Sequence, residues 1–465
     1  MKKPKIILIC IITIIIATIT IYAINKKSNI TTNDESELTT FNEAESTIIE
    51  FTEDKQNNVS ITKGGTYTLT GKNDNSSITI DTEEEVTLIL NNLELTNQTG
   101  PAITVENAKQ VVITLKDDTT NKLSDGKNTN QEYDATIFSK DNLTINGNGT
   151  LEINTTFENG IKCNDELKIL SGNIEINANT NGIIGKDSIT IKSGNITITS
   201  GQDGIKSDND EEEKGNIIIE DANIKINSKN DGIQAQNNLT INNGTFNITT
   251  SNGSSELIPK QGWETTTTTD EESAKALKAG TTLTINNGTF ILDSKDDAIH
   301  SNGNTTINNG TYTIKSNEDG IHADSLVEIN DGIINITASE GIEATYVKIN
   351  KGNITIEASD DGINAGAKTK DYTPTIEINE GNIIIKMTSG DTDGIDSNGN
   401  IYINGGTIDI TGNSPFDYDL EAKYTGGKII VNGEETNQIT NQMIGPMMQG
   451  GMNQTMQGGR EMQRR

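Results

Sequence analysis

The most constraining feature of this 465-residue chain is a repeated motif in which Ile follows Gly or Ala, with Asp, Asn or Glu in front. The motif runs from Asn159-Gly160-Ile161 to Asp393-Gly394-Ile395, and successive Ile residues are 22, 22, 28, 66, 22, 21, 21 and 32 positions apart. The step of 66 divides into 44 and 22 if Lys275-Ala276-Leu277 is a degenerate copy, with the additional length between Ser251 and Glu272. A period of about 22 residues with loop insertions indicates a solenoid.

Each repeat contains three short segments with the alternation of half-buried strands and no helical period between them. Leu239-Thr240-Ile241 and Phe246-Asn247-Ile248 are examples of the second and third segments. We therefore predict an all-β fold, a right-handed parallel β-helix whose like strands stack about 4.8 Å apart. The motif Ile and the small residue two positions later point inward, which makes Cys163 a buried residue without a chemical role. Asn-Asn-Gly segments, such as residues 242–244, predict corners with positive φ and Asn amides that bond along the axis.

The ends of the chain differ from the repeat. Residues 6–24 are apolar and uncharged and follow Lys2, Lys3 and Lys5, so residues 1–27 are predicted to form an uncleaved transmembrane helix with the bulk of the chain outside the cell. Cleavage after Ala23, which would give a secreted protein, is the alternative. We expect an acidic linker at residues 28–56, the β-helix at 57–432 and a disordered Met-, Gln- and Gly-rich tail at 433–465.

Composition limits the chemistry of the predicted fold. A formal net charge of −31, from 36 Lys plus Arg and 67 Asp plus Glu, repels nucleic acid and attracts cations. Two Cys and two His are too few for a zinc cluster, so a bound metal must have oxygen ligands, which favours Ca²⁺. Stacked coils place the motif acids in a ladder, and acids beside the motif enlarge it. The predicted calcium ligands are Asp203, Asp231, Asp296, Asp297, Asp319, Asp360, Asp361, Asp391, Asp393 and Asp396.

Two other interpretations of the same residues stay open. Asp-Gly also makes a good corner whose charge lies in water. The residue after each motif Ile faces outward beside the ladder, so Lys206 or Lys278 could act as the base of a calcium-dependent polysaccharide lyase, although solvated or ion-paired lysines are commoner. For sugar contacts, the candidates are His300, His322, Asn364 and Trp263, the last in the inserted segment.

The ordered succession of coil variants resembles a known family. Asp203-Gly-Ile-Lys-Ser-Asp, Asp297-Ala-Ile-His-Ser-Asn-Gly, Asp319-Gly-Ile-His-Ala-Asp and Asp393-Gly-Ile-Asp-Ser-Asn-Gly are similar to coils of the exported carbohydrate-binding β-helix family that is related in fold to calcium-dependent pectate lyases. The resemblance implies an extracellular protein that binds Ca²⁺ and a cell-wall or plant polysaccharide of the cellulose or polygalacturonate type. We expect a monomer whose partners are polysaccharide and, through the N-terminal helix, the membrane. A polysaccharide lyase and a structural stalk or adhesin without glycan binding are the alternatives.

Overall fold

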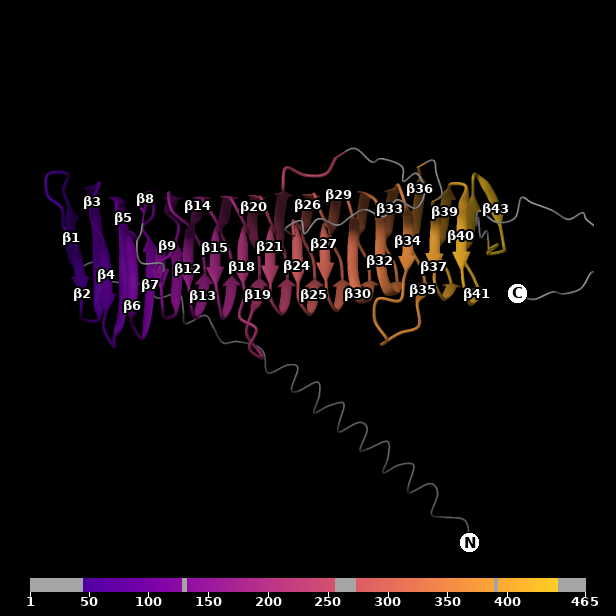
Figure 1. Ribbon diagram of the computed structural model, residues 1–465, viewed down its shortest axis with the longest axis horizontal. Coiled ribbons are helices and arrows are strands. Elements are labelled where there is room, and N and C mark those ends of the chain that lie inside the picture. Colours follow the sequence, from indigo (N-terminus) through magenta and orange to yellow (C-terminus); the bar gives the residue numbers. More distant parts are fainter. Residues whose placement is uncertain (1–44, 128–131, 256–272, 389–391, 442–465) are drawn as a thin grey trace, which may run out of the picture. The chain divides into compact units, whose positions relative to one another are not determined.

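The computed structural model describes residues 45–127, 132–255, 273–388 and 392–441, and the chain divides into two compact units, Met1–Ser46 and Thr47–Arg465. The second unit is all-β in its described part (Figure 1). Among the residues that the structure describes, no helix has the length and apolar character needed to cross a membrane; the predicted transmembrane helix at residues 6–24 lies outside them.

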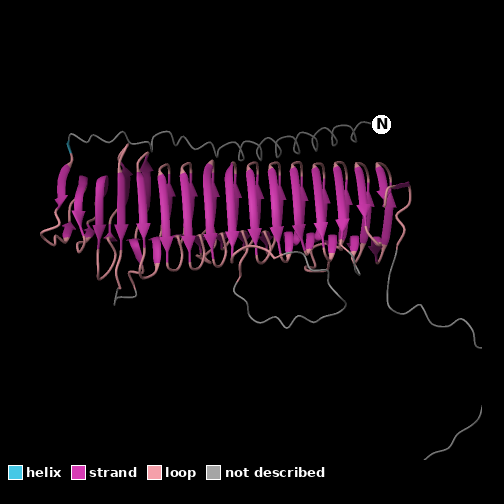
Figure 2. Cartoon of the chain, turned by 90° about the horizontal axis from the view of Figure 1, so that it is seen from above, coloured by secondary structure: helices cyan, strands magenta, loops and turns pink. Residues whose placement is uncertain are grey.

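The strands stack as the 22-residue period predicts. Each strand pairs in parallel with its counterpart one coil later, usually three strands on, and Figures 1 and 2 show these strands side by side. Strand pairing begins before the predicted start at residue 57, because Thr47 on the first strand pairs with Tyr67. The N-terminal coils contain β1 (Thr47–Phe51), β2 (Val59–Ile61), β3 (Gly65–Asn73), β4 (Ile78–Asp81), β5 (Glu85–Thr96), β6 (Ile103–Asn107), β7 (Gln110–Leu115), β8 (Thr120–Ser124) and β9 (Ala135–Ser139).

From the fourth coil onward the strands form three columns. The first column carries the motif and contains β12 (Asn159–Cys163), β15 (Ile183–Gly185), β18 (Ile205–Ser207), β21 (Ile233–Ala235), β24 (Leu277–Ala279), β27 (Ile299–Ser301), the first halves of β30 (Asp319–Ile329) and β32 (Glu340–Ile349), β34 (Asp361–Ala365), β37 (Asp393–Ser397) and β40 (Ser414–Tyr418). Leu277 pairs with Ile233 and Ile299, which confirms the degenerate copy of the motif.

The second column follows a corner. It contains β10 (Leu143–Gly147), β13 (Glu166–Ile169), β16 (Ser188–Ile191), β19 (Asn216–Ile219), β22 (Asn238–Ile241), β25 (Thr282–Ile285), β28 (Asn304–Ile307), the second halves of β30 and β32, β35 (Thr375–Ile378), β38 (Asn400–Ile403) and β41 (Glu421–Tyr424).

The third column closes each coil. It contains β11 (Thr150–Asn154), β14 (Asn173–Ala178), β17 (Asn195–Ser200), β20 (Ala222–Ser228), β23 (Gly244–Thr250), β26 (Thr289–Ser294), β29 (Thr311–Ser316), β31 (Ile333–Ala338), β33 (Asn353–Ala358), β36 (Asn382–Met387), β39 (Thr407–Thr411) and β42 (Lys428–Val431). Among the described residues the final strand is β43 (Glu434–Thr436), which returns antiparallel to β42, so the order of the chain continues past residue 433, where the disordered tail was predicted to begin.

The inward side chains of all three columns form one continuous core of Ile, Leu, Val, Ala and aromatic residues. Cys163 belongs to it and is fully buried, as predicted. The Asn-Asn-Gly corners also match the prediction, since Gly244, Gly288 and Gly310 have φ of 134°, 138° and 131°. Neighbouring Asn amides bond along the axis, as between Asn308 and Asn286 (2.7 Å). These features make a β-solenoid consistent with the predicted parallel β-helix; its right-handed sense stays a prediction.

Candidate functional site

In most coils the residue that opens the motif binds the next coil through its side chain. Oδ1 of Asp203 accepts a hydrogen bond from the backbone N–H of Asp231 at 3.0 Å, so a carboxylate replaces part of the regular backbone pairing. We call this series the motif ladder. Its other contacts join the side chain of Asn159 to Asn181 N (3.1 Å), Asn181 to Asp203 N (3.0 Å), Asp231 to Lys275 N (2.9 Å), Asp297 to Asp319 N (3.0 Å) and Asp361 to Asp393 N (3.3 Å).

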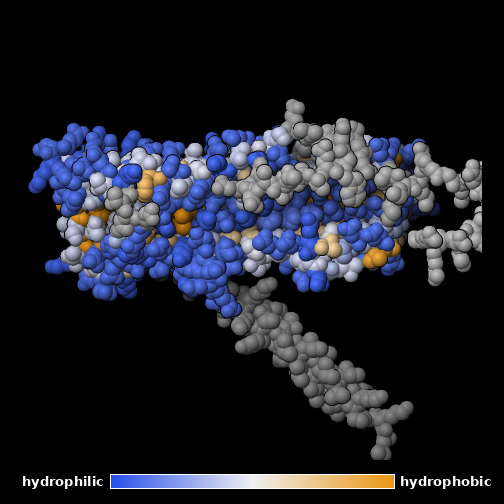
Figure 3. Space-filling model, viewed as in Figure 1, coloured by the Kyte–Doolittle hydropathy of each residue, from blue (hydrophilic) through white to orange (hydrophobic). Residues whose placement is uncertain are grey.

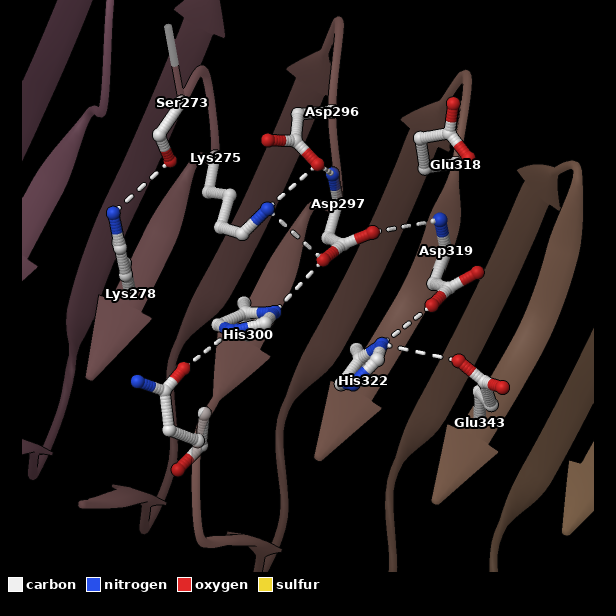
Figure 4. Close-up of polar contacts among 12 residues, drawn as sticks. Ser273, Lys275, Lys278, Asp296, Asp297, His300, Glu318, Asp319, His322 and Glu343 are labelled. Carbon is white, nitrogen blue, oxygen red and sulfur yellow. Dashed lines mark hydrogen bonds and ion pairs between the residues drawn. The ribbon is translucent and has the colours of Figure 1, made fainter. Parts of the chain in front are cut away.

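In the middle coils the second carboxylate oxygen of the ladder binds a cationic or imidazole side chain (Figure 4). Most of the partners lie one residue after a motif Ile or Leu, where the strand alternation places the side chain on the outer surface of the first column, whereas Lys275 itself occupies a ladder position. The Oδ2 contacts are Lys206 to Asp203 (3.0 Å), Lys278 to Asp231 (2.9 Å), Lys275 and His300 to Asp297 (3.2 and 2.8 Å) and His322 to Asp319 (2.6 Å).

These ladder acids are buried, which corrects the interpretation of Asp-Gly as a corner with a solvated charge. Asp203 is 5% exposed and Asp231 2% exposed. Burial disfavours the charged form and raises the pKa of Asp203, although Lys206 opposes the shift. At Asp297 the net shift has the opposite sign. Burial is again the largest single effect and raises the pKa, but the hydrogen bond from His300 and the charge of Lys275 together outweigh it, so the pKa of Asp297 falls below its usual range. The paired cations are therefore part of the fold.

His322 is the most enclosed of the cationic groups. Its Nδ1 lies 2.6 Å from Asp319 Oδ2 and 3.2 Å from Glu343 Oε2. Burial by itself lowers the pKa of the imidazole. The hydrogen bonds to these two acids raise the pKa by more than burial lowers it, and it reaches about 11. Two carboxylate acceptors on Nδ1 favour the protonated ring, which has no lone pair for a metal. Glu343 Oε1 also accepts a hydrogen bond from Lys368 Nζ at 2.8 Å, so Glu343 has a second cationic partner.

The proposed base of a lyase is not presented in a reactive form. Lys206 and Lys278 each donate to a buried carboxylate of the ladder, at 3.0 and 2.9 Å. Lys278 also lies 3.0 Å from Ser273 Oγ. An ammonium must lose a proton before it can act as a base, and the neutral amine would leave the buried acid without its counter-charge, which is costly. The geometry therefore gives these lysines a structural role.

The ladder changes character from the coil of Glu340 onward, where acids of successive coils gather. Glu340, Asp360 and Asp361 each bring one carboxylate oxygen to within 4.8 Å of one another. Asp361 pairs in register with Asp393. One residue beyond the buried Ile, the in-register outward series continues from Asn364 through Asp396 to Asp417. We call the residues Glu340, Asp360, Asp361, Asp393, Asp396 and Asp417 the acidic cluster.

The charges in the acidic cluster raise one another's pKa values. Burial first, then Glu340, Asp360, Asp396 and Asp393, raise the pKa of Asp361 to about 9. Burial first, then Asp393, Asp417 and Asp419, raise the pKa of Asp396 to about 7. Carboxylates this close cannot all ionise at neutral pH without a counter-cation.

Two oxygen atoms of this region are buried without a hydrogen-bond partner, Asn364 Oδ1 and Asp417 Oδ1. Asn364 is held by its amide nitrogen, which donates to Glu340 Oε2 at 3.0 Å. Unsatisfied buried oxygens are uncommon, and an ion or water is a frequent reason for them. All the candidate ligand atoms of this region are oxygens of the kind that Ca²⁺ prefers, so the residues present fit this ion.

The structure thus separates the predicted metal ligands into two groups. Asp203, Asp231, Asp297 and Asp319 lie in the paired part of the ladder, and Asp296 contacts Lys275 Nζ at 2.6 Å. Asp360, Asp361, Asp393 and Asp396 come together in the acidic cluster. Asp391 and Trp263 lie outside the described residues.

Sequence reasoning did not propose Glu340 or Asp417 as ligands. Asp417 lies on the coil of Phe416, which replaces the motif Ile and pairs with Ile395. The 21-residue step between Ile395 and Phe416 is the signal that could have placed Asp417 beside Asp396. Of the predicted sugar contacts, His322 is 9% exposed and serves the ladder, whereas Asn364 adjoins the acidic cluster.

The chain is similar to a known protein in sequence and to a solved structure. A carbohydrate-binding domain-containing protein of Acetivibrio thermocellus is 37% identical over 128 residues, which are 26% of this chain and 45% of that protein. The chain thus spans less than half the length of this relative. A solved structure described as that of the polysaccharide lyase-like protein from C. thermocellum, gadolinium derivative, is similar with 36% identity and a TM-score of 0.43, over 44% of this chain and 92% of that one.

The family profile covers most of the solenoid. It matches residues 54–320 and 316–425, which together include the paired ladder and the acidic cluster. The chain therefore belongs to the family of carbohydrate-binding domain-containing proteins.

Proposed function

We propose that the protein is an extracellular, calcium-binding polysaccharide-binding protein of the cell surface. The observation that carries the calcium part is the acidic cluster, in which carboxylates from successive coils raise the pKa of Asp361 to about 9. The polysaccharide part rests on membership of a carbohydrate-binding family. The N-terminal apolar run at residues 6–24 is proposed as the membrane anchor, with secretion after cleavage as the alternative.

Calcium would have a structural and a binding role in this proposal. The ion replaces, in the C-terminal coils, the Lys and His side chains that neutralise Asp203, Asp231, Asp297 and Asp319 in the middle coils. Ca²⁺ takes six to eight oxygen ligands, and a site on the outer surface of a coil leaves room for ligands from outside the protein. A carboxylate or hydroxyl of a glycan would be such a ligand. We propose polysaccharides of the cellulose or polygalacturonate type as the partners.

A binding experiment tests the proposal. Residues 45–441 are incubated with insoluble cellulose and with immobilised polygalacturonate, with Ca²⁺ or with chelator. The proposal predicts retention on at least one of them, and weaker retention on polygalacturonate after chelation. No retention on either glycan would leave the structural stalk as the better account.

The lyase alternative has its own readout. Incubation with polygalacturonate and Ca²⁺ should yield no unsaturated product, because Lys206 and Lys278 neutralise buried ladder acids. Growth of absorbance from unsaturated ends would show that the protein is an enzyme.

A further inference from the structure

The outward face of the third column is a broad surface whose composition differs from that of the rest of the chain. From β17 to β33 its strands present three outward positions each, and these alternate with buried core residues. Of the twenty-one outward residues, fifteen are Thr or Asn, two are Ile, two are Lys and two are acidic. The face is therefore electrically balanced in a chain of net charge −31. We call it the Thr/Asn face.

The outward residues form three rows along the axis, because all neighbouring strands from β17 to β33 pair residue for residue. Equivalent residues of neighbouring coils lie about 4.8 Å apart, and residues two positions apart on one strand lie about 6.6 Å apart. The central row contains Thr197, Lys225, Asn247, Ile291, Thr313, Asn335 and Thr355. Hydroxyl and amide groups thus recur on a regular two-dimensional grid, in the stacked strand arrangement that Figure 2 shows.

Aromatic rings stack beneath the face at about the spacing of its strands. Phe246 and Phe290 stack with ring centroids 4.8 Å apart and planes 5° apart, and Phe290 and Tyr312 stack at 4.7 Å and 3°. All three rings are buried. Ordered side chains on a rigid support lose little conformational entropy when they bind, which favours an extended, repeating partner.

Two apolar side chains interrupt the polar grid. Ile291 and Ile333 are each 50% exposed, on neighbouring rows of the face. Thr and Asn donate and accept hydrogen bonds, and Ile offers apolar contact. Sugar rings present hydroxyl groups at their edges and C–H groups on their flat faces, so a glycan matches both kinds of side chain. Outside the atoms drawn in grey, the side of the molecule seen in Figure 3 is predominantly hydrophilic.

We propose that the Thr/Asn face binds a neutral, extended polysaccharide, with chains lying against the rows of Thr, Asn and Ile. This inference rests on the proposed function and specifies its surface and its ligand class. The charge balance of the face favours an uncharged partner, since a polyuronate would be repelled by the chain's negative field and gains no cationic row here. Polygalacturonate binding, which would require the acidic cluster and calcium, should be independent of this face.

Binding to microcrystalline cellulose tests the inference, with residues 45–441 as the protein. The double variant Ile291→Lys/Ile333→Lys places two charges on the face and should weaken binding by at least tenfold. Thr313→Lys, in the centre of the face, should weaken it in the same direction. Ile218→Lys is the matched control, because Ile218 is 38% exposed on β19 of the second column. Thermal midpoints of all variants establish that they are folded.

The outcomes separate the two proposals. Loss of cellulose binding in the face variants, with wild-type binding in Ile218→Lys, supports the inference. Unchanged cellulose binding by both face variants overturns it and leaves the proposed function intact, as does a wild type that binds polygalacturonate but not cellulose. A wild type that binds neither glycan removes the proposed function as well. A wild-type dimer that Thr313→Lys converts to monomer in sedimentation would assign the face to a second copy, which also overturns the inference.

Discussion

Replacement of Asp361 by Asn should stabilise the metal-free protein and weaken its response to calcium. Burial and neighbouring acids raise the pKa of Asp361 from 3.8 to about 9, so the folded state binds a proton that the unfolded state releases over this pH range. The free energy of unfolding therefore falls as pH rises from about 4 to about 9, by about 1.4 kcal/mol per unit for this group. At pH 7.5 the limit of the cost is about 5 kcal/mol.

The expected gain in Asp361→Asn is about 2 kcal/mol, because the side chain retains some access to water and the neighbouring acids relax. The amide keeps the Oδ1 acceptor for the backbone N–H of Asp393, so the coil contact is preserved. In saturating Ca²⁺ the sign should reverse. An ion at a thousand times its dissociation constant stabilises the wild type by about 4 kcal/mol, and the variant has lost a ligand.

Denaturant unfolding of residues 45–441 at pH 5 and 7.5, in chelator and in Ca²⁺, measures both effects. The matched control is Asp208→Asn, an exposed acid after β18. The reasoning requires that Asp361→Asn raise the midpoint in chelator more at pH 7.5 than at pH 5, and that the control change neither midpoint. A destabilised Asp361→Asn in chelator, or an unaltered calcium response, would refute it.

Three further predictions concern the ladder and the core. Lys278→Met leaves Asp231 buried without its ion pair and should lower the free energy of unfolding by about 3 to 5 kcal/mol. The control Lys109→Met breaks an exposed ion pair with Glu85 and should lower it by less than about 1 kcal/mol. Equal losses would contradict the structural role of the ladder. The pKa of His322 is raised to about 11, so its ring should show no titration by NMR between pH 5 and 8. Its contribution to stability should be complete below about pH 6.5 and should be lost only as pH rises through about 11. A titration midpoint near 6.5 would exclude the imidazolium assignment. Phe290→Ala should cost about 3 to 5 kcal/mol by removing the centre of the aromatic stack, and a change below 1 kcal/mol in thermal or denaturant unfolding would show that the stack is dispensable.

Periodicity was sufficient to predict the strand columns. The spacing of the motif predicted that Leu277 stands in place of Ile, and the residue-by-residue pairing with Ile233 confirms it. Alternation within each strand predicted the inward Cys163, and the Asn-Asn-Gly segments predicted the corner glycines. These features follow from backbone geometry that repeats every coil, so a one-dimensional pattern contains them.

The sequence predicted where the charged residues of the site lie along the repeat, but not which of them form ion pairs. The sequence pattern located Lys278 one residue after a motif position, yet its ammonium reaches back to Asp231 on the preceding coil. Lys275 fills a ladder position and neutralises Asp296 and Asp297. Side-chain reach and burial decide such pairings, and neither has a period. Asp417 was not predicted as a ligand for a different reason, because the aromatic Phe416 before it replaces the Ile that defines the motif.

Calcium stoichiometry after equilibrium dialysis tests the central claim most directly. The account predicts at least one tightly bound ion in the wild type and in Asp203→Asn, where Lys206 already supplies the cation, and fewer ions in Asp361→Asn. A wild type that retains no calcium, or a loss of calcium in Asp203→Asn with full retention in Asp361→Asn, would contradict it.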